Sequence, residues 1–311
     1  MKVEGGGKDT PPEYTPPESG TTVTGVLFAL GSFLIWGLFP VYFKHLESVP
    51  ALEVLAHRVV WSALFAAMLL TLLGRWRGVA DAVRSRRVIA TLALSALAIS
   101  LNWGVFIWAV ANNRVLDSSL GYYINPLVSV LLGVVVLQER LRAAQWVAVA
   151  LAAAGVGHEV IGTGVLPWIP LTLACSFAVY GLIRKIASVD ALTGLFMETL
   201  IAMPLALGYL LAVHAAGSSG LAAAGSTGTA VLLVLAGVVT TLPLLLFIGA
   251  ARRIRLSTLG ILQYIVPTGH FMIAVYVFGE PMSPQRVATF ICIWIALLIY
   301  SLQATRHASS G

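Results

Sequence analysis

The sequence contains one long pattern twice. Residues 123–139 read Tyr-Ile-Asn-Pro, an apolar run and Leu-Gln-Glu, and residues 264–280 read Tyr-Ile-Val-Pro, an apolar run and Phe-Gly-Glu. In both copies the tyrosine stands three residues before the proline and the glutamate thirteen residues after it, so the copies are 141 positions apart. A long internal period constrains the whole fold, because each copy must form the same structural unit. We therefore predict that the chain consists of two related halves.

The apolar runs indicate whether these halves lie in water or in a lipid bilayer. The chain is 59% hydrophobic and 10% charged, whereas soluble domains are about 25% charged. Ten segments approach or exceed the roughly 20 residues that a helix needs to cross a bilayer, and strands are excluded because an open sheet leaves backbone groups unpaired in lipid. We predict an all-α integral membrane protein with ten transmembrane helices. The predicted spans are 24–44, 51–73, 87–109, 115–137, 143–161, 166–186, 191–214, 228–250, 256–279 and 284–304.

Ten spans in two copies give five spans per copy. An odd number places the second copy upside down in the membrane, an inverted repeat that recurs in secondary transporters. The first five-helix repeat is predicted over 23–161 and the second over 162–304. The Pro- and Gly-rich residues 1–22 are predicted to form a disordered cytoplasmic tail, 305–311 a second cytoplasmic tail, and the Gly-, Ser- and Ala-rich residues 215–227 a flexible link.

The basic residues predict the orientation. Of the 19 Lys and Arg residues, fifteen fall in the predicted inner loops and tails, and only Lys44, Arg114 and Arg286 fall outside. This distribution predicts a multi-pass protein with both termini in the cytoplasm. Because the positive charges lie in short loops between apolar runs, they do not predict nucleic-acid binding.

Several motifs resemble those of one transporter family. They are Phe-Leu-Ile-Trp-Gly at 33–37, His-Arg-Val-Val-Trp-Ser at 57–62, Asn-Trp at 102–103, Phe-Ile-Trp-Ala-Val at 106–110, Ser-Leu-Gly-Tyr-Tyr-Ile-Asn-Pro at 119–126, Leu-Ser-Thr-Leu-Gly at 256–260 and Gln-Tyr-Ile-Val-Pro at 263–267. After residue 22 the chain resembles the RarD-type permeases of the EamA branch of the drug/metabolite transporter superfamily. The resemblance implies a permease of the bacterial inner membrane, in a family associated with chloramphenicol sensitivity. The Pro-rich tail and Val266 depart from the family pattern.

Ionisable residues inside predicted spans are functional candidates, because a charge in lipid costs several kcal/mol unless it is paired or hydrated. Glu53, His57 and Arg58 lie in the second span, and Glu198 lies in the seventh, its inverted counterpart. One interpretation is a cavity lined by Arg58, with Glu53, His57 and Glu198 as proton acceptors. The alternative is a buried Glu–Arg or Glu–His pair that holds helices together, and it is favoured for Glu53 and His57.

Polar and aromatic residues gather in the middle of other spans. The predicted cavity residues, besides Arg58, are Asn102, Trp103, Tyr122, Tyr123, Asn125, Gln263 and Tyr264. Pro126 and Pro267 are predicted to kink their helices, because a missing N–H frees a carbonyl. The alternative is that the aromatic residues anchor helices at the headgroups and the prolines only shape packing. Trp108 is interpreted as such an anchor, and His270 as a packing residue.

The remaining signals argue against catalysis. No phosphate-binding loop and no Gly-x-Ser-x-Gly elbow occurs, and His158-Glu159 does not complete a metal motif because residue 162 is Gly. Cys175 and Cys292 stand alone in apolar segments, so neither a metal nor a cofactor is predicted. Glu139 and Glu280 fall at helix ends, where they are predicted to pair with loop bases or backbone donors.

The sequence thus predicts a secondary transporter for a small organic metabolite or drug-like solute, working by alternating access. Coupling to protons is a hypothesis that rests on the buried carboxylates and His57. A non-transporting scaffold, a membrane-embedded enzyme and a passive channel are the alternatives. A monomer is compatible with the sequence, because two five-helix halves already enclose a cavity. A homodimer formed through Gly- and Ala-rich helix faces is also compatible with it.

Overall fold

All regular elements that the structure describes are helices. The computed structural model describes residues 19–137, 143–251, 253–254 and 262–308, and residues 1–18, Glu139 and the start of the predicted ninth span lie outside this part. The helices are α1 (Ser19–Gly37), α2 (Phe39–Lys44), α3 (Ala51–Leu72), α4 (Trp76–Arg84), α5 (Arg86–Ala111), α6 (Val115–Leu137), α7 (Ala143–Thr163), α8 (Trp168–Ile186), α9 (Ala191–Ala215), α10 (Gly220–Ala224), α11 (Thr227–Ala251), α13 (Ile265–Met272), the π-helical η1 (Ile273–Val277) and α14 (Pro284–Ala308).

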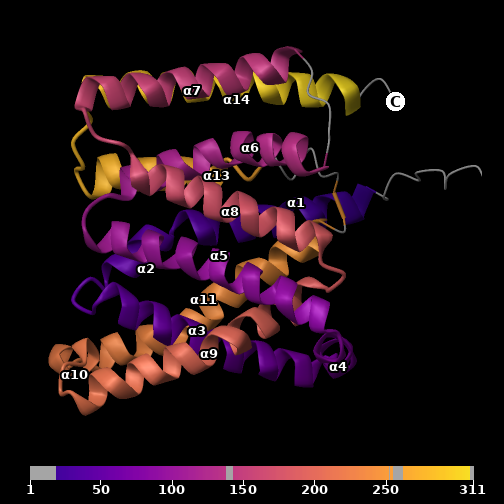
Figure 1. The fold of residues 1–311 in the computed structure, drawn as a ribbon, viewed down its shortest axis with the longest axis vertical. Helices are drawn as coiled ribbons and strands as arrows, with labels where there is room; N and C mark the ends of the chain where they lie inside the picture. Colours follow the sequence, from indigo (N-terminus) through magenta and orange to yellow (C-terminus); the bar gives the residue numbers. More distant parts are fainter. Residues whose placement is uncertain (1–18, 138–142, 252, 255–261, 309–311) are drawn as a thin grey trace, which may run out of the picture.

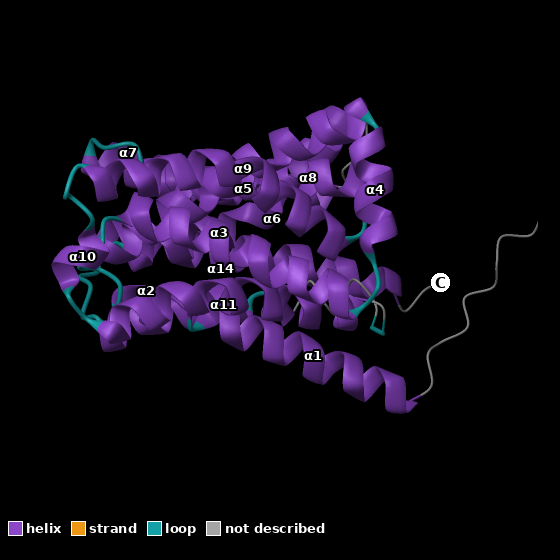
Figure 2. Ribbon diagram, turned by 90° about the horizontal axis from the view of Figure 1, so that it is seen from below, coloured by secondary structure: helices purple, strands orange, loops and turns teal. Residues whose placement is uncertain are grey.

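The long helices lie side by side, and the connections gather at two opposite ends (Figures 1 and 2). We name these the α4 end and the α10 end, after the short helix found at each. The described chain begins with α1 and ends with α14 at the α4 end (Figure 1). Both ends of the described chain therefore lie on one side of the molecule.

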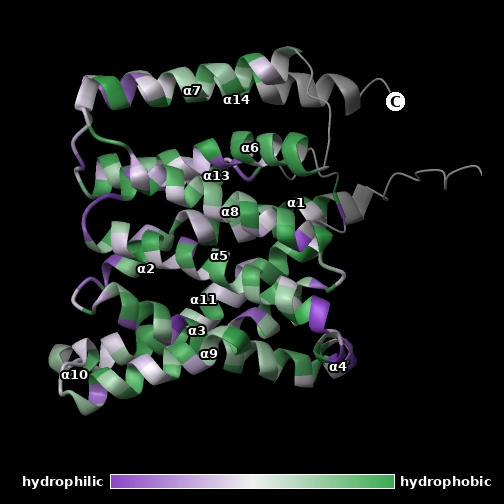
Figure 3. Ribbon diagram, in the orientation of Figure 1, coloured by the Kyte–Doolittle hydropathy of each residue, from purple (hydrophilic) through white to green (hydrophobic). Residues whose placement is uncertain are grey.

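The described helices include seven candidate membrane spans and three shorter apolar stretches. Within the described residues, seven are long and apolar enough to cross a bilayer, namely Val23–Lys44, Ala51–Leu72, Arg86–Ala111, Val115–Val136, Trp146–Thr163, Ala191–Ala215 and Thr227–Ala250. Three shorter apolar helices cover Trp168–Arg184, Ile265–Val277 and Pro284–Ile299. Hydrophobic residues cover the length of the helices, and hydrophilic residues gather mostly at the two ends (Figure 3). The chain is thus an all-helical multi-pass membrane protein, while a count of ten crossings and an inverted repeat stay predictions.

Two short helices lie in stretches that the sequence predicts as connections. The amphipathic α4 joins the second and third predicted spans and buries Val79 and Ala82. Within the predicted flexible link 215–227 the chain forms α10, whose first amides are bound by side chains of Ser219 and Glu53. The prediction of a link without structure is wrong there, because a buried carboxylate from another helix satisfies the α10 N-terminus.

The ends of the first and last spans also differ from the prediction. Residues 19–22, assigned to the tail, belong to α1, and α14 continues to Ala308, past the predicted boundary at 304. The first span is interrupted after Gly37, and Pro40 stands in the first turn of α2. Because proline has no N–H, it cannot donate to the carbonyl four residues earlier, which is that of Trp36.

The core forms where helices from the two halves of the sequence pack together. The most extensive contacts join α6 with α8, α7 with α14, α3 with α9, α3 with α11, and α1 with α11. Large buried side chains of α2, α5, α6 and α14 form the main apolar cluster, which includes Phe43, Phe106, Leu120 and Phe290. Of the predicted site residues, Tyr123 belongs to this cluster, and Tyr122 and Tyr264 pack against it.

Candidate functional site

Among the described residues, one arginine is buried, and it lies where four helices meet. Arg58 of α3 is 3% exposed, and its Nε donates a hydrogen bond of 2.9 Å to the Thr240 hydroxyl of α11. Its guanidinium carbon lies 4.1 Å from the ring centre of Trp103 on α5. The rings of Phe43 and Phe39 on α2 lie at 5.3 and 5.5 Å. We call Arg58, Thr240, Trp103, Phe39 and Phe43 the Arg58 box.

Local sequence explains how the box forms. The break before Pro40 starts α2 as a new helix, and Phe39 and Phe43 are four residues apart, so both face the same side. On the opposite side, α11 approaches α3 closely at Gly237. A Cβ added at Gly237 would lie 2.4 Å from the Trp61 carbonyl oxygen, so a side chain there would push the helices apart. The glycine therefore allows Thr240, one turn further along, to reach Arg58.

Arg58 has no acidic partner in the described part of the chain. No carboxylate there forms an ion pair with it, and the titratable groups in its electrostatic range are the phenols of Tyr122 and Tyr42. A guanidinium carries five N–H donors, and Thr240 accepts from one of them. The box thus holds a cation among aromatic faces, and it has the chemistry to bind an anion.

His270 of α13 packs on aromatic neighbours of the box, as the sequence interpretation expects. It is 2% exposed, stacks on Phe106 at 5.3 Å between ring centres, and meets the Tyr122 ring edge-on at 5.6 Å. Its Nε2 lies 3.0 Å from the Trp36 carbonyl, the one that Pro40 leaves free. Because a carbonyl only accepts, Nε2 carries the proton, and Nδ1 is a buried acceptor without a hydrogen-bond partner among the described residues.

A close helix crossing brings His270 to this carbonyl. A Cβ added at Gly269 would lie 3.1 Å from the Gly37 Cα, so the backbones of α13 and α1 almost touch. Small residues allow this approach between membrane helices. The signal in the sequence was the pairing of Gly37 with a nearby proline, which marks a break in the helix.

The two predicted asparagines hold helices together. Asn102 donates to the Leu173 carbonyl at 3.0 Å and to the Ser176 hydroxyl at 3.1 Å, and it accepts from the Tyr122 hydroxyl at 3.0 Å. Asn125 donates to the Ala174 carbonyl at 3.1 Å. Both amides therefore bind α8, and of this group Tyr122 is the residue that also faces Arg58 and His270.

The tyrosines of the repeated motif meet each other. Tyr123 and Tyr264, equivalent in the two copies, stack with ring centres 6.4 Å apart, and the Tyr123 hydroxyl lies 2.7 Å from that of Thr268. Tyr123 also packs against Phe290 and Trp294 of α14. This pair has a different aromatic environment from Arg58, so the predicted cavity residues fall into two groups.

Three further predicted residues, Gln263, Pro126 and Pro267, contribute to packing near these two groups. Gln263 is partly buried beside Tyr264. Pro126 lies inside α6, which is continuous from Val115 to Leu137, and Pro267 lies in the first turn of α13. The Pro267 carbonyl accepts a hydrogen bond from Ser119 at 2.8 Å, so this proline contributes to the contact between α13 and α6.

A buried carboxylate occupies the corresponding place in the second half. Glu198 is the eighth residue of α9, as Arg58 is of α3. It accepts from Ser95 at 2.6 Å and from Tyr180 at 3.5 Å, and its Oε1 lies 3.7 Å from Arg184 Nη1. We call these four residues the Glu198 cluster. Its charge is balanced within the chain.

The other two acid–base candidates lie at the α10 end. Glu53 is 1% exposed and accepts from the Ser219 hydroxyl at 2.7 Å and from the Gly220 and Leu221 amides at 2.7 and 3.1 Å. His57 is half-buried within electrostatic range of Glu53. Glu53 therefore has a structural role, but as the cap of α10 and not in the Glu–Arg pair that the structural alternative proposes.

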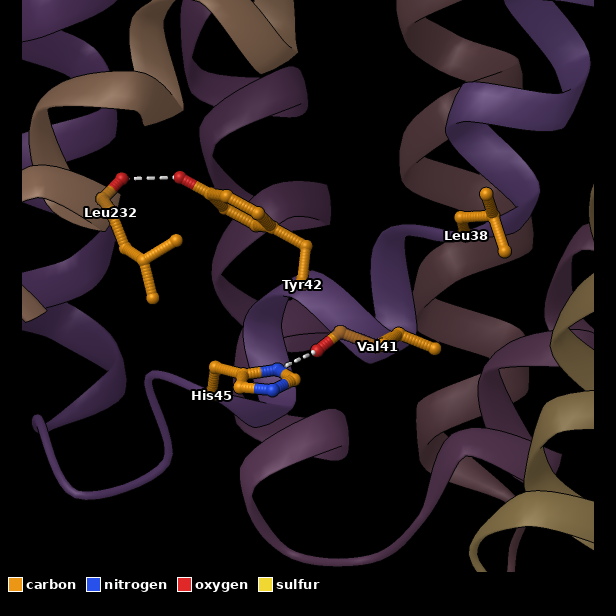
Figure 4. A pocket seen from close by; sticks show the side chains of 5 residues that line it. All are labelled: Leu38, Val41, Tyr42, His45 and Leu232. Atoms are coloured by element: carbon orange, nitrogen blue, oxygen red, sulfur yellow. Dashed lines mark hydrogen bonds between the residues drawn. The ribbon is translucent and has the colours of Figure 1, made fainter. Parts of the chain in front are cut away.

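A pocket opens beside the box, between α2 and α11. Its volume is about 370 Å³, and Leu38, Val41, Tyr42, His45 and Leu232 line it (Figure 4). The Tyr42 hydroxyl donates to the Leu232 carbonyl across the pocket (Figure 4). Tyr42 thus lines the pocket and also lies within electrostatic range of Arg58.

Two carboxylates outside the spans have opposite pKa shifts. Burial raises the pKa of Glu280, and the charge of Asp117 adds to this, although the Leu116 and Val115 amides and Arg286 oppose it. Burial would also raise the pKa of Asp190. There, hydrogen bonds from Thr193 and Leu192 and the Arg75 guanidinium outweigh burial, so the pKa lies below its ordinary value.

The charges around Glu280 form a network at the α10 end. Glu280 accepts from the Val115 and Leu116 amides at 2.6 and 2.8 Å, which confirms the predicted pairing with backbone donors. Arg286 binds both Asp117 and Glu159 at 2.8 Å. Among the described residues, no cluster of His, Cys, Asp and Glu has the composition of a metal site.

Comparison with known proteins places the chain among transporters. Residues 23–157 match the model of the EamA-like transporter family. An "Uncharacterized transporter" of Vibrio cholerae is 47% identical, covering 95% of this chain and 98% of the relative. Protein RarD of Escherichia coli is 46% identical over 91% of this chain and 95% of the relative.

A more distant relative supports the same family, and a solved structure supports the fold. The "Chloramphenicol-sensitive protein RarD" of Pseudomonas aeruginosa is 34% identical over 91% of this chain and 95% of the relative. A crystal structure with 18% sequence identity has a TM-score of 0.58 and covers 92% of this chain and 99% of that chain. At that identity the structural likeness supports the fold alone.

Proposed function

The chain belongs to the RarD-type branch of the EamA-like transporter family, and on this premise we propose that it is a secondary transporter of a small organic solute. The solute binds at the Arg58 box and crosses the membrane by alternating access between two inverted five-helix halves. We place the protein in the bacterial inner membrane with both termini in the cytoplasm. Fusion of a reporter that is active only in the cytoplasm to either terminus tests this orientation.

The observation that carries the proposal is the buried Arg58. A cation among aromatic rings, without an acidic partner in the described residues, costs free energy unless another role retains it. Ionisable groups inside membrane helices typically mark substrate or ion pathways. Contacts from α2, α3, α5 and α11 converge on Arg58, and α11 belongs to the second predicted half.

Helix contacts support the inverted halves. When each helix is exchanged for its predicted counterpart, the pair α6–α8 becomes α13–α1, α5–α8 becomes α11–α1, and α5–α9 becomes α11–α3; each of these pairs is in contact. The pairs α3–α9 and α7–α14 are their own counterparts and are also in contact. Such a pattern is expected of two halves that can rock about a shared site.

Solute flux in proteoliposomes tests the transport proposal. Purified protein is reconstituted and exposed to a mixture of amino acids, nucleosides, organic acids and chloramphenicol, the last because one relative carries it in its name. A carrier should accumulate some solute above protein-free vesicles, with a rate that saturates as the concentration rises. A rate that rises without saturation would indicate a channel, and no flux of any solute would favour a scaffold.

Reagent accessibility tests alternating access directly. Thr240 contacts Arg58 towards the α10 end, and Ser95 contacts Glu198 towards the α4 end. In a background with Cys175 and Cys292 replaced, we expect cysteines at positions 240 and 95 to react with impermeant reagents from opposite sides. A saturating solute should change the two rates in opposite directions, and parallel changes would contradict the mechanism.

Proton coupling is the finer part of the proposal, and Glu198 is the residue that best supports it. Glu53 is engaged by α10 and His57 is only half-buried, whereas Glu198 is buried between α5, α8 and α9. An imposed pH gradient should therefore drive solute accumulation, and Glu198→Gln should abolish this drive while allowing downhill flux. Equal flux with and without the gradient would remove the proton from the mechanism.

A further inference from the structure

We propose that the transported solute is an organic anion, a carboxylate with an apolar body, whose acidic group binds Arg58. This inference rests on the proposed transport function and names the class of substrate. It excludes neutral and cationic solutes as the principal cargo. It also assigns different parts of the Arg58 box to the charge and to the body of the solute.

The first argument is that Arg58 is an exception among the buried charges. Each buried carboxylate of the described residues has donors within the chain. Glu198 has Arg184, Asp117 and Glu159 share Arg286, and Glu53 and Glu280 accept backbone amides. Arg58, which is the buried cation of these residues, has only the hydroxyl of Thr240. A buried charge without a partner is strongly unfavourable, so the box is suited to an anion that arrives with the solute.

The second argument is the geometry of the guanidinium. Its Nε points to Thr240, and aromatic rings lie over it, with Trp103 the closest at 4.1 Å. Neither interaction uses the donors on Nη1 and Nη2. These two nitrogens form the fork that binds both oxygens of a carboxylate in parallel, and no hydrogen bond of theirs occurs within the described residues.

The third argument concerns the body of the solute. Phe39, Phe43 and Trp103 surround the cation, and Phe106 continues the aromatic wall towards His270. A small, strongly hydrated inorganic anion would lose its water without gaining apolar contacts. A carboxylate attached to a flat or aliphatic body gains both the ion pair and burial against rings.

Charge balance adds a mechanistic reason. The empty box is positive, and a bound monocarboxylate makes it neutral. Moving a neutral pair through the low-dielectric interior costs less than moving either charge alone. The loaded protein should therefore change conformation more readily than the empty one, as a secondary transporter requires.

The experiment separates solutes by charge. A small-metabolite extract is divided by ion exchange into anionic, neutral and cationic fractions, and each is offered to proteoliposomes that contain the wild type, Arg58→Gln or Arg58→Lys. The solutes that accumulate are identified by mass spectrometry. Arg253→Gln is the matched control, because Arg253 also lies over an aromatic ring, that of Phe28 at 5.2 Å, but stands outside the box.

We expect carboxylates from the anionic fraction to accumulate with the wild type and with Arg253→Gln. Arg58→Gln should lower this accumulation at least about tenfold, the change that 1.4 kcal/mol of lost binding produces. Arg58→Lys should retain an intermediate level, since an ammonium keeps the charge but not the fork. If Arg58→Gln does not fold, the Lys variant and competition of wild-type uptake by each fraction provide the same test.

Three outcomes would overturn the inference. Accumulation from the neutral or cationic fraction alone would leave transport standing and make the anion inference wrong. Anion uptake that Arg58→Gln and Arg58→Lys leave unchanged would remove Arg58 from the site. No accumulation from any fraction would contradict the transport proposal itself, and the anion inference with it.

Discussion

The Arg58 box and the Glu198 cluster occupy matching places in the two halves but differ in what they hold. Each is centred on the eighth residue of its helix, α3 or α9, and each includes a hydroxyl from a neighbouring helix, Thr240 or Ser95. The Glu198 cluster contains an arginine as counter-charge, at 3.7 Å. The Arg58 box contains aromatic rings instead.

The difference separates a charge that the chain balances itself from a charge that it leaves without a counter-charge. In the Glu198 cluster the chain satisfies its own carboxylate, so removing either charge leaves the other buried and alone. In the Arg58 box, no carboxylate of the described residues forms an ion pair with the arginine, so its removal leaves no opposite charge unpaired. Stability should therefore depend strongly on Glu198, and solute binding should depend strongly on Arg58.

The largest effect is expected when Glu198 becomes Leu. Arg184, whose side chain is 14% exposed, would then be buried without a counter-charge, and we expect unfolding in mixed micelles to require about 3–5 kcal/mol less free energy. The double variant Glu198→Leu with Arg184→Met should recover most of this loss. A loss that the second substitution does not recover would show that the two charges are not coupled.

An intermediate effect is expected from the matched hydroxyls. Thr240→Val leaves the Arg58 Nε without an acceptor, which costs about 1–3 kcal/mol for a buried donor, and it should weaken solute binding because the fork is no longer oriented. Ser95→Ala should cost a similar amount of stability at Glu198. Half-saturation of solute uptake should rise with Thr240→Val and stay constant with Ser95→Ala, and the opposite order would reverse the assignment of the two sites.

A smaller effect on stability is expected from Arg58→Met. The methionine fills a similar volume among the rings and removes an uncompensated charge, so the free energy of unfolding should change by less than about 1 kcal/mol or increase. Unfolding of this variant is compared with that of Glu198→Leu under identical conditions. A loss above about 2 kcal/mol would mean that Arg58 holds the helices together.

The smallest effects concern pH, and they extend the comparison to the two ends of the molecule. The raised pKa of Glu280 means that the folded state binds its proton more tightly, so its stabilising contribution is present below the ordinary pKa and is lost as pH rises through the folded pKa. The lowered pKa of Asp190 has the opposite sign. Its contribution is present above the ordinary pKa and is lost as pH falls through the folded pKa.

Unfolding curves between about pH 2 and 7 measure both signs, because the Asp190 contribution changes below its ordinary pKa and the Glu280 contribution changes above its own. The stability of Glu280→Gln relative to wild type should increase as pH rises, because the neutral side chain does not become charged. The stability of Asp190→Asn relative to wild type should fall as pH rises, because the wild type gains the contribution of the charged Asp190. Differences that do not vary with pH would show that neither carboxylate titrates differently in the folded state.

The sequence predicted the helices well because their signal is physical and local. Apolar runs of span length identify membrane helices regardless of tertiary contacts, and each predicted span overlaps an apolar helical stretch. The short helices α4 and α10 were not predicted. The N-terminus of α10 depends on a hydrogen bond from the Gly220 amide to Glu53, which lies 167 positions earlier in the sequence. Spacing alone does not reveal which loop folds over a buried carboxylate.

The site was predicted in part for a related reason. Arg58 was identified because a charge in lipid is costly, and Trp103 and Tyr122 because polar and aromatic residues gather in the middle of their spans. The structure brings these three residues together. Thr240 and Phe39 were missed, because a threonine or phenylalanine in an apolar helix carries no signal by itself. His270 was correctly expected to pack on its neighbours. Its unpaired Nδ1 was not predicted, because the ring is oriented by the Trp36 carbonyl, which Pro40 of a different helix leaves free.

The pairing of α7 with α14 has a consequence for the order of biosynthesis. These helices pack mainly against each other at one edge of the molecule, although α7 ends at Thr163 and α14 begins only at Pro284 (Figure 1). A ribosome that has finished the first half must therefore make more than a hundred further residues before α7 meets its partner. During that interval α7 waits in the bilayer with lipid against the face that α14 later covers. The packing of α7 is thus completed by a helix that is synthesised much later.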